Sequence, residues 1–453
     1  MLWHLVLLAV VAVTAAAADD SSSTDSGPTA RTATTPVAVP TAAQLAWQDR
    51  EIGAMITFNM QTYGLLPVAT HKHPPPASTF SADQLSTDQW ISAAKSFGAK
   101  YAVLTATHRS GFALWPTKSH NYSVASSSYR GDVVRDFVAS CKKFGLVPGL
   151  FWTQRFNDYF GVPNGGLVNA SRAVKAVTQA QYDQMMSVQL EELAAYEGIE
   201  EIWINGAIEG PAAPQLAAQL ARLFPNSTCH SCAGHSYPDG GVPTRNNIRW
   251  VGDELAFGPQ PSWSAMGVTG LDQGHTGDPR GALYDPPSCD AVLREHCWFG
   301  GDAYPPGHCH ISSPRNLLRK YLTSVGRNCN LILNIAPDTH GALGAAELDA
   351  YRSMGQAVDC MFSKPVAETA GNASLTMDAA TRTIEWVLPP TGAPCQNCSL
   401  VLMEELEQGQ LIGNYSLLCQ SECSGAEDGC RVGAEPWKPC VSTARLLVAA
   451  LRQ

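Results

Sequence analysis

Apolar residues follow two different periods along the middle of the chain. Short continuous apolar runs, typical of buried strands, alternate with longer segments whose apolar residues recur at helical spacing. In residues 132–144, for example, Val133, Phe137 and Cys141 share one helical face, and the pattern stops at Gly145. The predicted strands are 54–58, 101–106, 146–152, 199–204, 248–251 and 331–335, and the predicted helices are 83–97, 132–144 and 181–196.

Alternation of strands and helices over roughly 300 residues favours a parallel α/β fold. This length suits a TIM-like (β/α) barrel, and an open doubly wound sheet is the alternative. No glycine-rich G-x-G-x-x-G turn follows a predicted strand and no Walker lysine loop is present, so nothing supports nucleotide binding.

The two ends of the chain differ from this middle part. Residues 2–18 are apolar and close on a run of small residues, which predicts a secretory signal peptide cleaved near Ala18; a membrane anchor is the alternative. A Ser-, Thr-, Ala- and Pro-rich linker follows, and we expect order to begin near Trp47. Beyond residue 362 the sequence predicts short strands at 375–377, 383–387 and 400–403 among cysteine-rich loops. The predicted organisation is a signal peptide at 1–18, a disordered linker at 19–40, a barrel-like catalytic domain at 41–362 and a small β-sandwich-like domain at 363–453.

Fourteen cysteines, most of them in the second half of the chain, indicate disulfides and therefore the secretory pathway, with an extracellular or lysosome- or vacuole-like destination. Cys229 and Cys232 are also spaced like half of a zinc site, with His230 and His235 nearby. Six N-glycosylation sequons fit the same compartment, at Asn121, Asn169, Asn226, Asn372, Asn397 and Asn414.

The formal net charge is −10, and the sequence contains no run or stripe of Lys and Arg residues. This balance argues against nucleic acid and anionic membranes as partners. We expect neither a cofactor nor a metal ion in this protein.

In a parallel barrel the working residues lie just beyond the carboxyl ends of the strands. The segments in such positions are Thr107–Pro116, Thr153–Phe156, Asn205-Gly206, Gly252–Glu254 and, after Cys297, Trp298-Phe299. Aromatic rings, histidine, arginine and a carboxylate at strand ends suggest a sugar site. Each candidate has a structural alternative: Trp115 as core, His108 as a structural histidine, and Glu254 as a surface carboxylate.

Four stretches resemble glycoside hydrolase family twenty-nine, the α-L-fucosidases. They are 51–59, 101–116, 201–207 and 325–338, within a matching region of about 47–363. The resemblance implies a barrel followed by a β-sandwich. It also implies removal of terminal α-L-fucose from glycans or glycoconjugates by a retaining mechanism with two carboxylates.

The resemblance implies roles for individual residues. Glu254, at the end of Arg249–Glu254, matches the acid/base, and Asn205 occupies the nucleophile position in Trp203-Ile204-Asn205-Gly206. The implied substrate-binding residues are His108, Arg109, Trp115, Trp203, Trp298 and Thr57.

Four positions depart from the family pattern, and one of them is Asn59, which stands where a glycine is expected. Arg109 stands where the second histidine of a pair is expected, and Thr57 stands where the early histidine is expected. Asn205 replaces the nucleophilic aspartate, and a neutral carboxamide does not supply the negative charge that the transition state requires.

The asparagine leaves several interpretations open. The protein is a fucosidase, or a pseudoenzyme that binds fucose or fucosylated glycan without cleaving it, or a secreted glycan-binding module. Another carboxylate, Glu209 or Asp253, replaces the missing one, or deamidation of Asn205-Gly206 restores aspartate. An engineered change or an error in the gene sequence is a further explanation of the asparagine.

Overall fold

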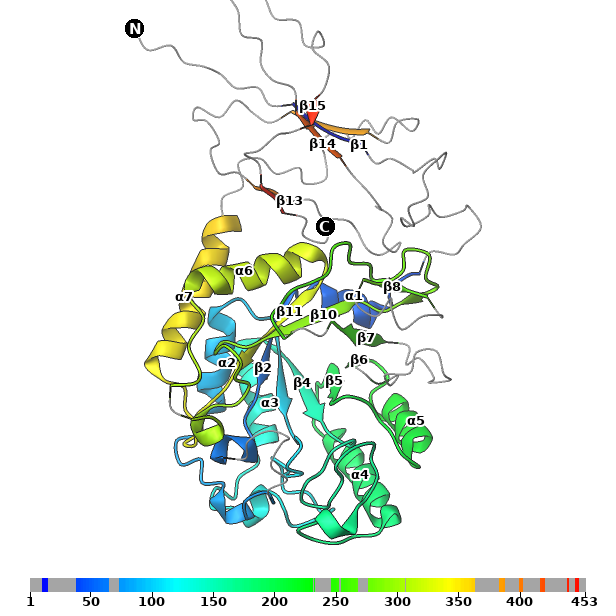
Figure 1. Cartoon of the computed structure of the whole chain (residues 1–453), viewed down its shortest axis with the longest axis vertical. Coiled ribbons are helices and arrows are strands. Elements are labelled where there is room, and N and C mark those ends of the chain that lie inside the picture. Colours follow the sequence, from blue (N-terminus) through cyan, green and yellow to red (C-terminus); the bar gives the residue numbers. More distant parts are fainter. Residues whose placement is uncertain are drawn as a thin grey trace, which may run out of the picture.

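The computed structural model describes residues 38–64, 73–230, 232, 246–251, 254–267, 276–305 and 307–362, together with the backbone of six short strands outside these ranges. Eight parallel strands close into a barrel and follow one another around it in chain order (Figure 1). They are β2 (Ile52–Ile56), β3 (Tyr101–Thr105), β4 (Val147–Trp152), β5 (Glu201–Ile204), β6 (Thr228–His230), β7 (Asn247–Trp250), β10 (Pro287–Ala291) and β11 (Asn330–Ile335). The predicted TIM-like barrel is confirmed, and the open doubly wound sheet is excluded.

Helices pack around this barrel. They are α1 (Ala42–Gln48), α2 (Thr87–Ser96), α3 (Val133–Phe144), α4 (Gln179–Leu193), α5 (Ala213–Leu223), α6 (Pro314–Ser324) and α7 (Ala345–Phe362). Short 3₁₀ turns lie at Met60–Tyr63, Ala77–Thr79, Val124–Ser126, Ala170–Arg172, Gly301–Ala303 and Val325–Arg327, and β8 (Ala265–Met266) pairs with β9 (Leu283–Tyr284). Within the described part of the chain, no helix combines the length and apolarity needed to cross a bilayer.

Local capping explains where the helices begin and end. Asp132 caps α3 by accepting the N–H of Arg135, and Gly145 closes it in the left-handed conformation at φ 75°. The capping box of Thr178 and Gln181 starts α4 two residues earlier than the apolar pattern predicts. A similar box starts α1 at Ala42, so order begins before the predicted point near Trp47.

The six strands outside the main ranges lie in two small sheets. β1 (Val10–Thr14) pairs with β12 (Thr383–Val387) and β14 (Ser416–Cys419), and β15 (Lys438–Pro439) extends this sheet. β13 (Ser399–Val401) pairs with β16 (Arg445–Leu447). The boundary of the C-terminal domain stays a prediction, and the strand predicted at 375–377 lies outside the described residues. β1 belongs to the predicted signal peptide, so cleavage near Ala18 would remove it from the sheet.

The core has two layers. One lies between the strands and the surrounding helices, and the other fills the barrel interior. The interior layer consists of Trp47, Met55, Tyr101, Val103, Phe151, Trp203, Ile248 and Ile332, with Val147 and Trp298 packed against it. Gly53 makes room for this filling, since a Cβ there would lie 2.3 Å from the Tyr101 ring.

Three disulfides join cysteines of the described part: Cys229–Cys232, Cys289–Cys329 and Cys297–Cys309. The zinc alternative for Cys229 and Cys232 is therefore wrong, because a disulfide leaves no thiolate for the metal. Cys289–Cys329 ties β10 to the residue that precedes β11, and Cys297–Cys309 closes the loop that carries Trp298.

A carboxylic acid lies inside the barrel, far from any strand's carboxyl end. Glu201 is the first residue of β5 and is 1% exposed, and its Oε2 accepts the indole N–H of Trp47 at 2.9 Å. Its Oε1 has no hydrogen-bond partner. Burial raises the pKa of Glu201 to about 7, although the Trp47 hydrogen bond and the charge of Arg50 oppose the rise.

Glu201→Gln is expected to make the stability of the protein less dependent on pH. A folded-state pKa above the ordinary 4.5 means that the folded protein binds this proton more tightly than the unfolded chain does. This contribution to stability is complete below the unfolded pKa and is lost as the pH rises through about 7, at a cost of about 3 kcal/mol. Thermal unfolding at pH 5 and pH 8 measures the effect; an equal change in Tm in both proteins would contradict it.

Candidate active site

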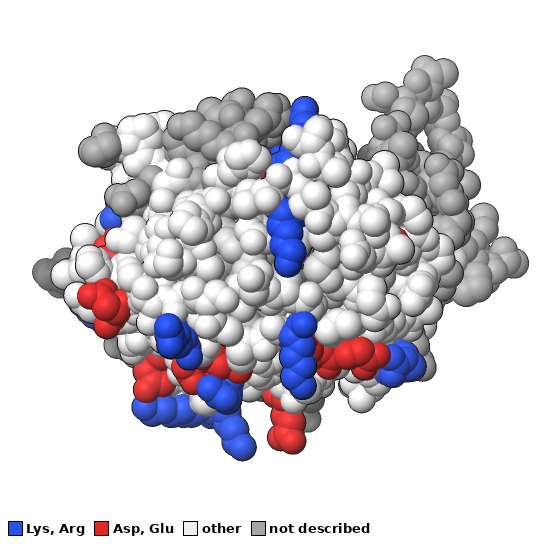
Figure 2. All heavy atoms as spheres, turned by 90° about the horizontal axis from the view of Figure 1, so that it is seen from below, with Lys and Arg blue, Asp and Glu red and all other residues white. Residues whose placement is uncertain are grey.

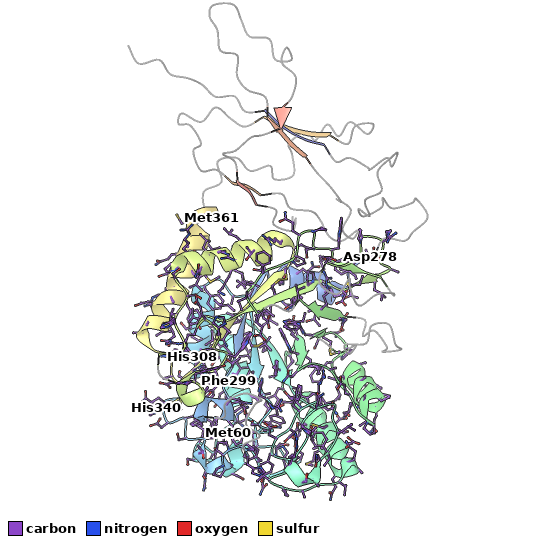
Figure 3. The ribbon with its side chains drawn as sticks, viewed as in Figure 1. Met60, Asp278, Phe299, His308, His340 and Met361 are labelled. Carbon is purple, nitrogen blue, oxygen red and sulfur yellow. A yellow bond between two sulfur atoms is a disulfide. The ribbon has the colours of Figure 1, made fainter. Side chains whose placement is uncertain are left out.

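The carboxyl ends of the barrel strands bring together residues that are distant in sequence. Thr57 follows β2, His108 follows β3, Asn205 follows β5 and Glu254 follows β7. Trp298 lies in the connection between β10 and β11. Figure 3 labels the neighbouring Met60 and Phe299, both toward the lower end of the barrel where these connections lie. The residues that follow these strands therefore lie together at one end of the barrel, which we call the barrel mouth.

Glu254 is held in this mouth by a tryptophan. The indole N–H of Trp298 donates to Glu254 Oε2 at 2.9 Å, and Glu254 remains exposed to solvent. Its backbone has φ 54°, a left-handed conformation that a non-glycine residue rarely adopts. An exposed carboxylate with a fixed N–H donor suits proton exchange with a bound ligand.

The backbone of Trp298 is fixed on both sides. Its N–H donates to Tyr304 Oη at 3.2 Å, and its carbonyl accepts Asn334 Nδ2 at 2.9 Å and the hydroxyl of Thr57. Asn334 is 1% exposed and also donates to Thr57. Burial and, more weakly, the Glu254 carboxylate raise the pKa of Tyr304.

Thr57 lies directly after β2, and its side chain contacts protein groups in this structure. It is 3% exposed, and its hydroxyl is engaged with Trp298 and Asn334. This hydroxyl positions Trp298 and is not turned toward a ligand.

If the fucosidase activity that the sequence resemblance implies is assayed, Thr57→Val is expected to slow cleavage of substrates with poor leaving groups by about tenfold, because Trp298 then holds Glu254 less firmly. Thr57→Ser keeps the hydroxyl and should stay near the parent value. The measurement is kcat/KM over a series of leaving groups, made in an Asn205→Asp background if the parent is too slow. An equal loss for every leaving group would contradict this role and indicate a structural defect.

Asn205 is fixed where β5 ends. Its backbone N–H donates to the carbonyl of Trp152, the last residue of β4, at 3.0 Å. Its side-chain amide donates to Thr153 Oγ1 at 3.3 Å. Gly206 follows with φ 83°, and a Cβ there would lie 3.1 Å from Arg155 Cδ. Arg155 therefore lies directly against the peptide that follows Asn205.

Glu209, the proposed substitute carboxylate, has a partner in this structure. Its Oε2 lies 3.3 Å from Arg155 Nε, and Gln154 bonds both its backbone N–H and its carbonyl. The carboxylate is thus close to the Asn205-Gly206 turn, but its charge is matched by a guanidinium. Asp253, the other proposed substitute, lies outside the described residues.

His108 lies in the mouth between two phenylalanines. Its ring stacks on Phe151 at 5.5 Å and meets the edge of Phe299 at 5.0 Å, and Gln61 Nε2 lies 2.8 Å from its Nδ1. The residue is partly exposed by area, yet these contacts remove water from most of the ring. Desolvation, helped by the charge of Arg109, lowers the pKa of His108 to about 4, so the ring is neutral near pH 7.

The other three predicted ligand-binding residues have different surroundings. Arg109 pairs with Asp158 at 3.3 Å and covers the Phe156 ring. Trp203 is 6% exposed and stacks on His230 at 3.5 Å, so it lies in the buried layer beneath the mouth. Trp115 is 2% exposed and donates to Glu192 of α4 at 2.9 Å, which places it in the shell between barrel and helix.

Residues that the sequence did not single out also belong to the mouth. Tyr304 and Asn334 hold Trp298, and Arg155 covers Gly206. Trp250, at the end of β7, is 39% exposed and donates to Asp290 of β10 at 2.9 Å. An exposed tryptophan at a barrel-strand end is a signal that sequence analysis could have used. Within the described part of the chain, no cluster of three or more His, Cys, Asp or Glu side chains could hold a metal ion.

Comparisons with known proteins identify the family. The family model for α-L-fucosidase matches residues 34–255. The chain is 28% identical over 352 residues to alpha-L-fucosidase 1 of Arabidopsis thaliana, covering 73% of this chain and 62% of that protein. It is 30% identical to a putative alpha-L-fucosidase 1 of Oryza sativa, covering 73% and 61%. The chain thus spans about three fifths of the length of these relatives.

Solved structures extend the comparison to the fold. A putative alpha-L-fucosidase of Bacteroides thetaiotaomicron superposes with a TM-score of 0.63 and 30% identity, covering 73% of this chain and 78% of that one. A glycoside hydrolase 29 family member from a rumen bacterium gives a TM-score of 0.60 and 25% identity, covering 74% and 60%. The chain belongs to the α-L-fucosidase family of glycoside hydrolases, family 29.

Proposed function

We propose that the protein is an α-L-fucosidase-type hydrolase, which binds a terminal α-L-fucosyl residue of a glycan in the barrel mouth and cleaves its glycosidic bond. The observation that carries this proposal is the Glu254 carboxylate, held at 2.9 Å by the Trp298 indole in the mouth that also contains Asn205. An isolated surface carboxylate would have no such donor and no aromatic neighbour aligned with it.

Glu254 is the proton donor and acceptor in this proposal. It protonates the leaving oxygen as the glycosidic bond breaks, and it then accepts a proton from the attacking water. Neutral His108 offers one hydrogen-bond donor and one acceptor, of which Gln61 engages Nδ1, leaving Nε2 for a sugar hydroxyl. The partly exposed ring of Trp298 offers the apolar contact that a 6-deoxy sugar needs.

Asn205 makes this hydrolase slow. The amide occupies the place of the second carboxylate, and it stabilises positive charge on the sugar far less than an anion does. Glu209 does not relieve this defect in the structure as it stands, because Arg155 is bound to it.

A pseudoenzyme that binds fucosylated glycan is the second candidate, and the neutral Asn205 is the observation that favours it. The two candidates share the binding pocket and differ in turnover. Hydrolysis of an activated aryl α-L-fucoside by the purified protein separates them, with L-fucose as competitor.

We expect slow hydrolysis that is inhibited by L-fucose. Binding of L-fucose without hydrolysis would establish the pseudoenzyme. Failure to bind L-fucose at all would overturn both candidates.

We also propose that the protein acts in the secretory pathway, outside the cell or in an acidic vacuole-like compartment. The apolar N-terminus, the sequons and the three disulfides support this location. Protease protection of the chain in isolated membrane vesicles, or its recovery from culture medium, tests it.

A further inference from the structure

Three consecutive strand-to-helix connections form a hollow beside the barrel mouth. Residues of the connections after β2, β3 and β4 enclose about 310 Å³. Its main lining residues are Pro74, Pro76, Asn121, Tyr122, Tyr159 and Val174. Figure 2 shows the molecule from the end at which these connections lie, and much of that face carries no charged side chain. We call this hollow the tyrosine groove.

The walls of the tyrosine groove are rigid. Tyr122 and Tyr159 stack face to face, with ring centroids 4.1 Å apart and planes inclined by 2°. Tyr122 is 2% exposed, and its hydroxyl donates to the carbonyl of Pro75 at 2.8 Å, which ties the β2 connection to the β3 connection. Phe160 meets Tyr159 edge-on at 5.0 Å. A ligand therefore meets a preformed wall made by the partly exposed Tyr159 and the exposed Pro76, with the buried Tyr122 behind Tyr159.

The tyrosine groove is connected to the proposed active site through the ion pair of Arg109 and Asp158. The residue before Tyr159 is Asp158, which pairs with Arg109 at 3.3 Å, and Arg109 adjoins His108. The backbone N–H groups of Asp158 and Tyr159 donate to the carbonyls of Arg109 and Ser110 at 2.8 and 3.3 Å. Arg109 and Asp158 therefore lie between His108 of the mouth and Tyr159 of the groove.

The chemistry of the lining selects the class of ligand. Tyrosine and proline rings and the methyl groups of Val174 offer apolar contact, and the amide of Asn121 and the hydroxyl of Ser126 offer hydrogen bonds at the rim. None of these lining residues carries a charge. Such a surface fits the alternating apolar faces and hydroxyl edges of neutral pyranoses, and it offers nothing to a sulfate or a uronate.

We propose that the tyrosine groove is the subsite for the neutral sugar residues to which the fucose is attached, so that the protein acts on neutral fucosylated oligosaccharides. This inference rests on the proposed function, because it places fucose in the mouth. Val174 is 46% exposed at the groove and marks its open side.

The test compares two substrates and three variants. The substrates are an activated aryl α-L-fucoside, which has no sugar beyond fucose, and a neutral fucosylated trisaccharide. Val174→Trp blocks the groove without removing a core side chain, and Tyr159→Ala removes its aromatic wall. Leu167→Trp is the matched control, since Leu167 is 54% exposed in the same connection but outside the lining.

We expect Val174→Trp and Tyr159→Ala to raise KM for the trisaccharide about tenfold, which corresponds to about 1.4 kcal/mol. The aryl fucoside should change by less than about twofold in the same variants. Leu167→Trp should leave both substrates at the parent values. If Tyr159→Ala does not fold, Val174→Trp alone decides.

Binding of the trisaccharide, measured by isothermal titration, separates this inference from the proposed activity. Weaker binding in Val174→Trp supports the groove even if no fucoside is cleaved. Equal trisaccharide affinity and KM in the parent and Val174→Trp would overturn it. A lower Tm in Val174→Trp with unchanged trisaccharide affinity, abolished by Asn121→Gln, would also overturn it, because the groove would then hold the protein's own glycan on Asn121.

Discussion

Asn205→Asp is expected to raise kcat for an aryl α-L-fucoside by a factor on the order of 10³ or more. The substitution changes one NH₂ group to an oxygen, and the backbone at the end of β5 already holds the side chain in place through Trp152. The Thr153 hydroxyl, which accepts from the amide at 3.3 Å, can rotate and donate to the carboxylate instead. The new anion lies beneath the developing positive charge and can form a covalent fucosyl intermediate.

The control for this gain is Asn205→Ala, which removes the amide without adding charge and should not increase the rate. A parent protein that already matches Asn205→Asp would contradict the expectation and place the negative charge elsewhere. A loss of activity in Glu209→Gln would then show that Glu209 leaves Arg155 and supplies the negative charge. Peptide mass spectrometry would show whether Asn205 has deamidated. We expect little deamidation, because the N–H of Asn205 is bonded to Trp152 and its amide to Thr153.

Glu254→Gln in the Asn205→Asp background is expected to lower kcat/KM for a fucosyl oligosaccharide by a factor on the order of 10² to 10⁴. Glutamine keeps the acceptor for the Trp298 indole but has no proton to give. The loss should be much smaller with an activated aryl leaving group, which departs without protonation.

Glu191→Gln is a matched control, because Glu191 is an exposed carboxylate of α4 that pairs with Arg222. It should leave the rate unchanged with both kinds of leaving group. If Glu254→Gln, like Glu191→Gln, left the rate of cleavage unchanged while glycan binding persisted, the acid/base role would be wrong. The protein would then be a glycan-binding module.

The amino-acid pattern predicts the barrel well where a strand or helix is encoded locally. Continuous apolar runs predict β3, β4 and β11. The apolar face of residues 133–144 and the glycine at position 145 predict α3. Strands β6 and β10 were missed. Their sequences, Thr228–His230 and Pro287–Ala291, contain polar residues and proline that are tolerated only because neighbouring strands pair with them.

The strand-end rule found His108, Asn205 and Glu254, since each follows directly from its own strand. It does not reveal that Thr57 serves Trp298, because that contact joins positions 241 residues apart and depends on Asn334 as well. Nor does it reveal that Trp115 faces α4, because only the packing of Glu192 against the β3 connection decides which way the indole points. Contacts between side chains across the barrel depend on the tertiary structure, and the local pattern of apolar residues does not predict them.

The Cys297–Cys309 bridge has a practical consequence for the catalytic assay. The bridge spans 12 residues and encloses both Trp298 and Tyr304, so it limits how far the indole can move from Glu254. A reductant in the buffer would release this loop while the barrel stays closed by its own strands. Protein purified with dithiothreitol, or made in a reducing cytosol, would then show lower activity even with aspartate at position 205.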